Sequence, residues 1–266
     1  MSNNNNNNDN LHGTQNLLSV TQPDEILPPV EDDNNVDNVD ELPEEDLPPD
    51  RTLLPRSMYV VFDLETDGLS RERNHIIEIA GQILDPLGNP YGNSFNSLVN
   101  PLSKISYLIQ NITGITNDDL KGQPLFNEVA SDFFKFIMTT IRQYEEENKT
   151  KMVRIVLVAH NGQRFDIPFL FKKIEQARLT NLIQTLIPRL YLIDTLLLSR
   201  ELVKKKNLPL PENYKLSTLF HYCTGEKMNN GHRALVDVLH TVRVLKFKKF
   251  WFDKDEFIFK TILLFW

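Results

Sequence analysis

The sequence predicts a mixed α/β fold, a five-stranded sheet with helices on both faces. Three short strand-like runs follow one another closely in the first part of the folded region, which predicts an antiparallel meander. Two later apolar runs alternate with helical patterns, which predicts parallel strands joined by crossovers. The 266 residues are enough for one such core with additional segments.

The strands are expected at residues 58–63, 75–84, 93–99, 152–159 and 189–193. The first is an apolar, β-branched run that ends in the turn-forming sequence DLETDG. The segment DPLGNP, between the second and third strands, is typical of a hairpin connection. The fourth strand is a continuous apolar run, as expected of a buried parallel strand.

Helices are expected where apolar residues recur at helical spacing. Pro168 falls in the first turn of one of them, where proline is tolerated. In the last helix, Leu235, Val238, Leu239, Val242 and Leu245 share one face. The expected ranges are 126–147, 166–178, 194–204, 214–222 and 234–248.

Composition divides the chain into three parts. Residues 1–56 form an Asn-rich, acidic tail, which we expect to be disordered because it has few large apolar residues. Residues 57–249 form the predicted folded domain. Residues 250–266 form an aromatic extension, expected to pack on the domain as an added strand or helix, with a membrane-surface contact as the alternative.

The net charge of −7 is unevenly distributed. Residues 1–50 hold thirteen acidic and no basic residues, so the rest of the chain carries 23 acidic against 29 basic residues. A basic body suits a polyanionic partner such as nucleic acid. Ordinary surface charge explains the same balance equally well.

Other features of the sequence bear on the compartment. Cys223 is the chain's single cysteine, which excludes an intrachain disulfide and favours a reducing compartment. The N-terminal region has neither the pattern of a secretory signal nor the Arg-rich, acid-poor composition of a transit peptide. No run approaches the ~20 apolar residues of a membrane span. We therefore expect an intracellular protein, cytoplasmic or nuclear.

Two carboxylates at the end of the first strand are candidate metal ligands. Asp63 and Glu65 are two residues apart, so a strand directs both to the same face. Carboxylate oxygens are hard ligands that suit Mg²⁺ or Mn²⁺. A solvated strand end is the simpler explanation of this pair taken alone.

Three further residues could complete the site. Asp166 follows the fourth strand, and would join the pair if that strand lies parallel to the first; helix capping is its alternative role. Asp237 lies about one turn into the last helix. His232 precedes that helix, so it can turn toward the site, whereas on one helix the two directions would diverge by ~140°. Surface exposure is the alternative for both.

Four carboxylates and one imidazole are what a two-metal nuclease needs. Two cations ~4 Å apart bracket the scissile phosphate, one activating water and the other stabilising the leaving 3′-oxygen. They also neutralise the charge that develops during displacement. His232 is the natural base for the attacking water.

The ordered motifs resemble a known family. FDLETDG, HNGQRFD and HRALVD match, in order, the three motifs of the DEDDh exonucleases, the DnaQ-like group of the ribonuclease H superfamily. NITGIT is similar to the family's "hGIT" segment, with Thr113 where His is usual, and IDTLLLSREL and YKLSTL are also similar. The resemblance covers about residues 57–247. It is strongest to plant organelle DNA-degrading exonucleases, with Trex-type and bacterial proofreading enzymes more distant.

This resemblance implies a ribonuclease H-like fold and a 3′→5′ exonuclease that releases nucleoside 5′-monophosphates with two Mg²⁺ or Mn²⁺. It implies that His232 is the base, because the sister branch carries Tyr where this chain has Arg233. By motif, the implied metal ligands are Asp63, Glu65, Asp166 and Asp237.

The resemblance also implies residues that bind substrate beside His232. Thr66 and Leu69 stand where relatives contact the terminal nucleotide, and Leu69 is a candidate wedge against the last base, with ordinary turn packing as its alternative. Asn161 corresponds to a family Asn near the fourth strand. Lys204, Lys205 and Lys206 are either phosphate contacts or a solvated helix end.

Several functional alternatives remain open. The expected partner is single-stranded or frayed 3′-terminal nucleic acid, with DNA favoured over RNA. The sequence itself does not separate the two, because the family acts on both. An RNA trimmer on the same fold is the second hypothesis, and a non-catalytic nucleic-acid binder the third. Relatives include monomers and homodimers, so a homodimer is possible. The acidic tail could dock onto another protein or shield the basic body.

Overall fold

The computed structural model describes residues 57–228, 231–251, 253–257 and 259–260. The predicted disordered tail at residues 1–56 lies outside these residues, as does the end of the extension at residues 261–266. All structural statements below concern the described part of the chain.

A mixed sheet forms the centre of the fold, with the strand order β3-β2-β1-β4-β5-β6. The first three strands pair antiparallel, whereas β1, β4 and β5 run parallel. The five predicted strands are thus confirmed, and the extension adds β6 antiparallel to β5. The bounds are β1 Ser57–Thr66, β2 Ile76–Leu84, β3 Phe95–Leu98, β4 Arg154–Ala159, β5 Leu190–Asp194 and β6 Phe259–Lys260.

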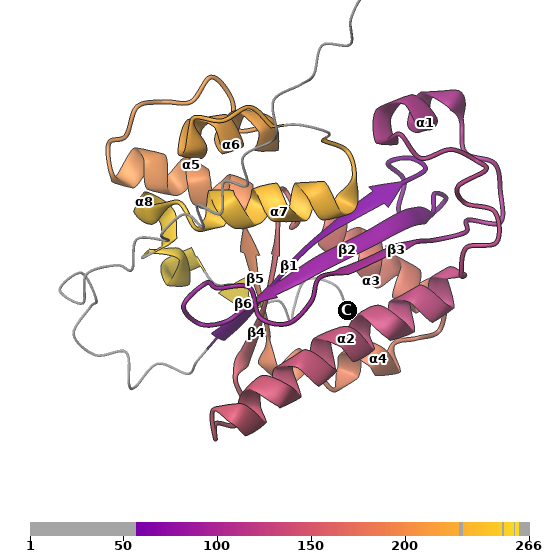
Figure 1. The fold of residues 1–266 in the computed structure, drawn as a ribbon, viewed down its shortest axis with the longest axis horizontal. Helices are drawn as coiled ribbons and strands as arrows, with labels where there is room; N and C mark the ends of the chain where they lie inside the picture. The colour runs from indigo at the N-terminus through magenta and orange to yellow at the C-terminus, as the bar shows by residue number, and fades with distance from the viewer. Residues whose placement is uncertain (1–56, 229–230, 252, 258, 261–266) are drawn as a thin grey trace, which may run out of the picture. The chain divides into compact units, whose positions relative to one another are not determined.

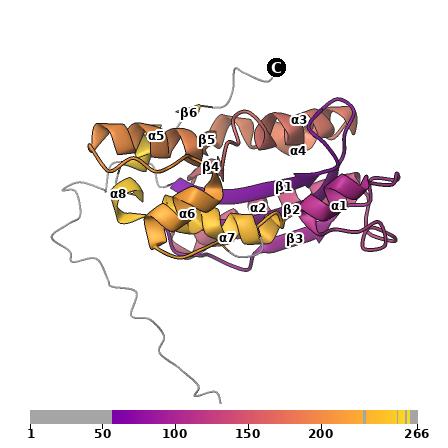
Figure 2. The ribbon, with the colours of Figure 1, turned by 90° about the horizontal axis from the view of Figure 1, so that it is seen from above.

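Helices cover both faces of the sheet, as predicted (Figures 1 and 2). One face packs against α2 (Phe126–Glu147), α3 (Asp166–Gln176) and α4 (Asn181–Gln184). The other packs against α5 (Thr195–Lys205), α6 (Leu216–Thr224), α7 (Ala234–Leu245) and α8 (Lys248–Trp251). Two short 3-10 turns span Ile187–Arg189 and Lys254–Phe257. No helix in the described residues is both long and apolar enough to cross a membrane.

Strand β1 belongs to both cores because its side chains alternate between the two faces. Val60 and Phe62 pack with the α2–α4 side, whereas Tyr59 and Val61 pack with the α5–α8 side. All four are essentially fully buried. The carboxylates that follow in β1 are therefore fixed by a strand whose apolar residues are buried on both faces of the sheet.

The structure corrects several details of the sequence prediction. Helix α1 (Tyr107–Thr113) was not predicted, because its seven residues, about two turns, are too few for a clear periodic pattern. Ser106 caps its start and Gly114 ends it in the left-handed conformation. The last helix ends at Leu245 rather than residue 248. Leu239 is 49% exposed, so it does not share the buried face of α7.

The start of the aromatic extension packs on the domain, as expected. Phe250 and Trp251 of α8 are buried in the same core as α5–α7. The ring of Trp251 meets that of Tyr59 edge-on, with centroids 5.3 Å apart. The extension thus adds a helix and a strand to this side of the domain.

The core around Phe133 of α2 should be a main source of stability. Phe133 is 1% exposed, and its ring centroid lies 5.3 Å from that of Phe95. It packs on Gly81 of β2, where a Cβ atom would come within 2.9 Å of the ring. We expect Phe133→Ala to lower the free energy of unfolding by about 3–5 kcal/mol in urea denaturation, since the ring leaves a cavity.

Leu210→Ala is the matched control, because Leu210 is 80% exposed. We expect this variant to stay within about 0.5 kcal/mol of the parent. A loss of less than about 1 kcal/mol in Phe133→Ala would contradict the assignment of this core.

Candidate active site

A cavity of about 610 Å³ opens beside the C-terminal end of β1. The eight residues predicted as ligands, base or substrate contacts all line it, although they come from three separate parts of the chain. The cavity wall consists of Asp63, Leu64, Glu65, Thr66, Asp67, Gly68, Leu69, Ser106, Leu108, Ile109, Ile112, Thr113, His160, Asn161, Phe165, Asp166, His232 and Asp237.

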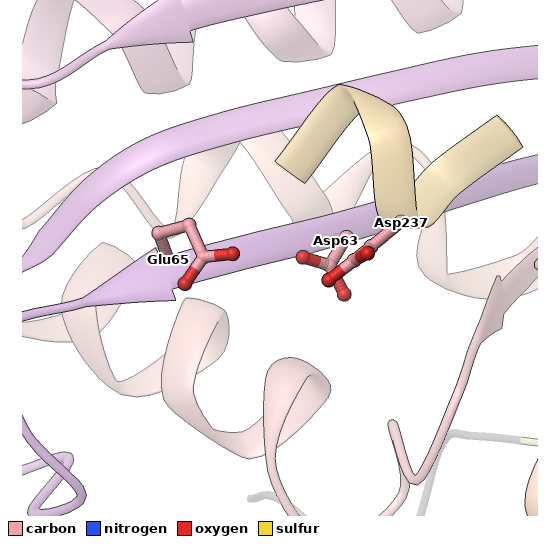
Figure 3. Close-up of side chains that lie close together, drawn as sticks. All are labelled: Asp63, Glu65 and Asp237. Atoms are coloured by element: carbon pink, nitrogen blue, oxygen red, sulfur yellow. The ribbon is translucent and has the colours of Figure 1, made fainter. Parts of the chain in front are cut away.

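Three carboxylates form the centre of this wall. One oxygen each of Asp63, Glu65 and Asp237 lie within 4.8 Å of one another. Figure 3 shows Asp63 and Asp237 with their carboxyl groups side by side and Glu65 directed toward them. Alternation along β1 places Asp63 and Glu65 on the same face, and α7 brings Asp237 across from above.

Asp166 lies in the same cavity but outside this group of three. It is 3% exposed and occupies the first turn of α3. The residue at the N-cap position is Phe165, and no side chain caps this helix, so the capping role for Asp166 is wrong. The parallel pairing of β1 and β4, which ends at Val61 and Val158, brings the two chain exits together as predicted.

His232 stands on the loop before α7, as its spacing from Asp237 predicts. Its backbone has φ of 69°, a left-handed conformation that is unusual for a side chain other than Gly or Asn. Its backbone N–H donates to Asp237 Oδ2 at 3.1 Å. The exposed His232 side chain also lines the cavity, so this turn joins the two residues of the third motif in one place.

The candidate substrate contacts also lie in the cavity wall. Thr66 ends β1, is buried, and donates its hydroxyl hydrogen to the Gly68 carbonyl oxygen at 2.8 Å. Leu69 is 85% exposed, so it does not pack into its turn, and it can contact a ligand instead. Asn161 adopts φ of 60° on the loop after β4.

Burial, together with repulsion from neighbouring carboxylates, raises the pKa of every candidate ligand. Burial is the largest cause in each case. The pKa of Asp63 is raised well above its usual value, with Asp166 and Glu65 as the main repelling neighbours. The pKa of Glu65 rises to about 8 and that of Asp166 to about 7. The pKa of Asp237 is raised as well.

This set fits a divalent cation. Four carboxyl groups supply the hard oxygen ligands that Mg²⁺ and Mn²⁺ prefer. Asp237 Oδ1 is buried and has no hydrogen-bond partner among the described residues, so it is available to coordinate a cation. A bound cation would also remove the repulsion that raises these pKa values.

An ion pair with one buried partner, not predicted from the sequence, supports the site. Glu78 of β2 is fully buried and pairs with Glu65 across the strands. It accepts hydrogen bonds from Arg233 Nε at 3.2 Å, Arg233 Nη2 at 2.9 Å and the Ala234 N–H at 3.0 Å. The signal was present, because a lone charge inside the apolar run HIIEIAGQIL needs a buried partner.

Two further missed residues hold the loop of the second motif. Asp194, which caps α5, accepts from the backbone N–H groups of Asn161 at 3.0 Å and Gln163 at 3.1 Å. His160 lies within 3.0 Å of both Thr195 Oγ1 and the Tyr214 carbonyl oxygen. Burial lowers the pKa of His160, which favours its neutral form. The adjacent Asp194 and Thr195 in the segment IDTLLLSREL were the sequence signal that could have indicated these contacts.

The three consecutive lysines lie away from the cavity. Lys204 and Lys205 are in the last turn of α5, and Lys206 follows as its C-cap. That end of α5 is about 15 Å along the helix from Asp194. Lys206 forms an ion pair with Asp253, so this residue at least has a structural contact.

Several known proteins are similar to this chain over most of its described residues. The model of the RNase T family, described as "Exonuclease", matches residues 60–245. The chain is 33% identical over 195 residues to the PolC-type DNA polymerase III of Clostridium perfringens, covering 71% of this chain and 11% of the polymerase. It is 32% identical over 200 residues to exonuclease DPD1, chloroplastic/mitochondrial, of Arabidopsis thaliana, covering 74% of this chain and 58% of that one.

Solved structures share the fold at lower identity. Escherichia coli exonuclease I in complex with a dT13 oligonucleotide has a TM-score of 0.54 and 18% identity, covering 74% of this chain and 43% of that one. A 3′-exonuclease that recognises the 3′ end of a histone mRNA stem-loop has a TM-score of 0.51 and 16% identity, covering 71% of this chain and 62% of that one. These similarities confirm a ribonuclease H-like exonuclease fold.

The raised pKa values predict a pH-dependent stability in the metal-free protein. A carboxyl group whose pKa is higher in the folded than in the unfolded state binds more protons when folded, so stability falls as pH rises through that interval. For Glu65 the interval runs from its ordinary value of 4.5 to about 8. We expect Glu65→Gln to be more stable than the parent at pH ~8 by about 1–3 kcal/mol, and the difference to vanish near pH ~4.

Urea denaturation in the presence of a chelator, repeated across this pH range, measures the effect. Asp132→Asn on α2 is the control, because this carboxylate is exposed and away from the cavity. Parallel stability profiles for the parent and Glu65→Gln would show that the carboxylates do not repel one another as the geometry indicates.

Proposed function

Since the chain belongs to the exonuclease family, as its resemblance to the DnaQ-like enzymes indicated, we propose that it is a metal-dependent 3′→5′ exonuclease that releases nucleoside 5′-monophosphates. The observation that carries the proposal is the convergence of Asp63, Glu65 and Asp237 within 4.8 Å in a cavity that Asp166 and His232 also line. The chain spans 58% of the Arabidopsis exonuclease and 11% of the bacterial polymerase.

The proposed ligands of two Mg²⁺ or Mn²⁺ are Asp63, Glu65, Asp166 and Asp237. When bound, such cations lower the pKa of water and stabilise the charge on a leaving 3′-oxygen. The raised pKa values of all four carboxyl groups support this assignment, because the folded chain holds them together against their repulsion. Arg233 moderates the repulsion at Glu65, but it is held by Glu78.

His232 is the proposed general base. Its imidazole would accept a proton from the attacking water at a ring nitrogen. The N–H···Asp237 hydrogen bond and the Arg233–Glu78 ion pair fix the turn that carries it, while its exposed side chain remains able to move. Asp237 and Arg233 thus fix the backbone of the turn that carries His232, and neither of these two contacts involves the imidazole ring.

The 3′-terminal nucleotide is proposed to contact Thr66, Leu69 and Asn161 beside His232. The exposed Leu69 side chain is suited to pack on the last base. Leu108 and Ile112 of α1 add apolar surface to the same cavity, and both are substantially exposed. An apolar wall next to a carboxylate cluster matches a nucleoside joined to a phosphate.

DNA is the proposed substrate, with single-stranded or frayed 3′ ends preferred. The oligonucleotide complex of exonuclease I and the family relationship to DPD1 and PolC-type polymerases support it. The 3′-exonuclease that recognises histone mRNA supports RNA as the alternative. Rates on DNA, RNA and chimeric oligonucleotides of one sequence would distinguish the two sugars, and a higher rate on RNA would overturn the preference for DNA.

The proposal also covers the organisation of the whole chain. It assigns residues 57–249 to the exonuclease domain, residues 1–56 to an acidic tail and residues 250–266 to an appended extension. We also propose an intracellular location, cytoplasmic or nuclear. The free thiol of Cys223 is consistent with a reducing compartment. A homodimer remains part of the proposal, and sedimentation of the full chain would test it.

Substitution of the proposed ligand and base should abolish Mg²⁺-dependent shortening of a 5′-labelled oligonucleotide. We expect Asp63→Asn to lower the rate by at least about 100-fold, because it removes a cation ligand from a preorganised site. His232→Ala should lower it by about 10²–10⁴-fold, as for loss of a general base. Gel analysis of the product ladder measures both.

Asp132→Asn serves again as the matched control and should keep the parental rate. Equal activity in Asp63→Asn and the parent would show that the cluster does not hold the catalytic cations. A parental protein that binds oligonucleotide but never shortens it would favour the non-catalytic binder.

A further inference from the structure

A second cavity of about 900 Å³ adjoins the candidate active site. The two cavities share part of their walls, namely His160, Asn161, His232 and Asp237. The second one extends from these residues along α5 and the start of α6. A ligand bound at the carboxylates can therefore continue from one cavity into the other.

The two cavities differ sharply in charge. The described residues that line the first include five Asp or Glu and no Lys or Arg. The second is lined by Arg200 and Lys215, and its one acidic residue is the shared Asp237. Both cations are exposed, and no ion pair to either is found within the described part of the chain. They can therefore bind an anion in this cavity.

The wall that carries these cations is fixed to the active site. The guanidinium of Arg200 lies over the ring of Tyr214, 5.3 Å from its centroid. The carbonyl oxygen of Tyr214 lies 3.0 Å from His160 Nε2, and His160 precedes Asn161 of the second motif. Lys215 follows Tyr214 directly. The cation positions are thus set by the loop that also forms the catalytic cavity.

This charge asymmetry matches the two sides of a scissile phosphate at a 3′ end. The terminal nucleoside beyond that phosphate carries no other phosphate, so it suits the acidic and apolar first cavity. Every nucleotide on the upstream side brings one phosphodiester, which requires cations. Single strands are commonly bound by such basic grooves with an aromatic ring beside them.

We propose that the second cavity binds the nucleic-acid strand upstream of the scissile phosphate, with Arg200 and Lys215 contacting its phosphates. This inference rests on the proposed exonuclease function and adds a direction to it. The strand enters over α5 and α6 and ends in the first cavity, so substrates long enough to fill both cavities bind best.

Equilibrium binding tests the inference without requiring turnover. The parent is full-length Asp63→Asn, and the probe is a 5′-fluorescent oligothymidylate of about twelve nucleotides, followed by anisotropy. We expect Arg200→Ala with Lys215→Ala to raise Kd about 10–100-fold at low salt. The slope of log affinity against log salt should become less negative by about 1.4, as for two lost single-strand phosphate contacts.

Lys135→Ala on α2 is the matched control, because it removes an exposed cation from the opposite face of the sheet. We expect its Kd and salt slope to equal those of the parent. Arg200→Lys should restore part of the affinity, since a charge alone retains a phosphate contact. An unchanged Kd and slope in the double variant would overturn the proposal.

Chain-length dependence gives a second, catalytic readout in the otherwise wild-type protein. The double variant should lose more kcat/KM on the long oligothymidylate than on the dinucleotide, which fills little of the second cavity. An equal loss at every length would overturn the proposal, because the substitutions would then act on the catalytic cavity. If the wild type cleaves nothing but binding still depends on Arg200 and Lys215, the exonuclease function fails and the binding site stands.

Discussion

Repulsion among carboxylates that the fold forces into one cavity is the constraint on which the site depends. Asp63, Glu65 and Asp237 lie within 4.8 Å of one another, and burial together with the charge of neighbouring carboxylates raises their pKa values. Holding these charged groups close together costs folding free energy, so the surrounding structure must be rigid enough to keep them in place. The rigidity comes from β1, which is buried on both faces and paired on both edges. The central strand of the sheet is therefore where a strained set of charges can be held.

Elements from the rest of the chain are positioned around this strand by buried polar contacts rather than by apolar packing alone. Glu78 lies beside Glu65 in the sheet and holds Arg233 and the start of α7, which orients Asp237. Asp194 plays the corresponding role for the loop after β4 through the N–H groups of Asn161 and Gln163. A buried carboxylate that loses its partner is costly. The second and third motifs are thus each held to a neighbouring strand by a buried carboxylate. A shift of either motif would leave that carboxylate without its hydrogen-bond partners.

These contacts explain which parts of the structure the sequence could predict. The five strands followed from apolar runs and turn residues, and the convergence of the proposed ligands followed from alternation in β1 and the order of the motifs. Helix α1 escaped detection because seven residues are too few for a periodic pattern, and among its apolar residues Ile109 alone packs against a buried cluster of the described chain. Glu78 and Asp194 also escaped, since their roles depend on partners 155 and 33 residues away. Contacts between distant residues decide such roles, and local patterns do not record them.

The two cavities on either side of the carboxylate cluster differ in charge, and the sequence motifs do not reveal this difference. An exonuclease must distinguish the end of a strand from its interior, and the end differs chemically in having no further phosphate. A wall with acidic and apolar residues on one side and Arg200 and Lys215 on the other makes this distinction by electrostatics. A strand running the opposite way would leave Arg200 and Lys215 without upstream phosphates to contact. Because opposite charges attract, these two basic side chains favour the orientation in which the upstream phosphates lie beside them and the phosphate-free end lies in the first cavity.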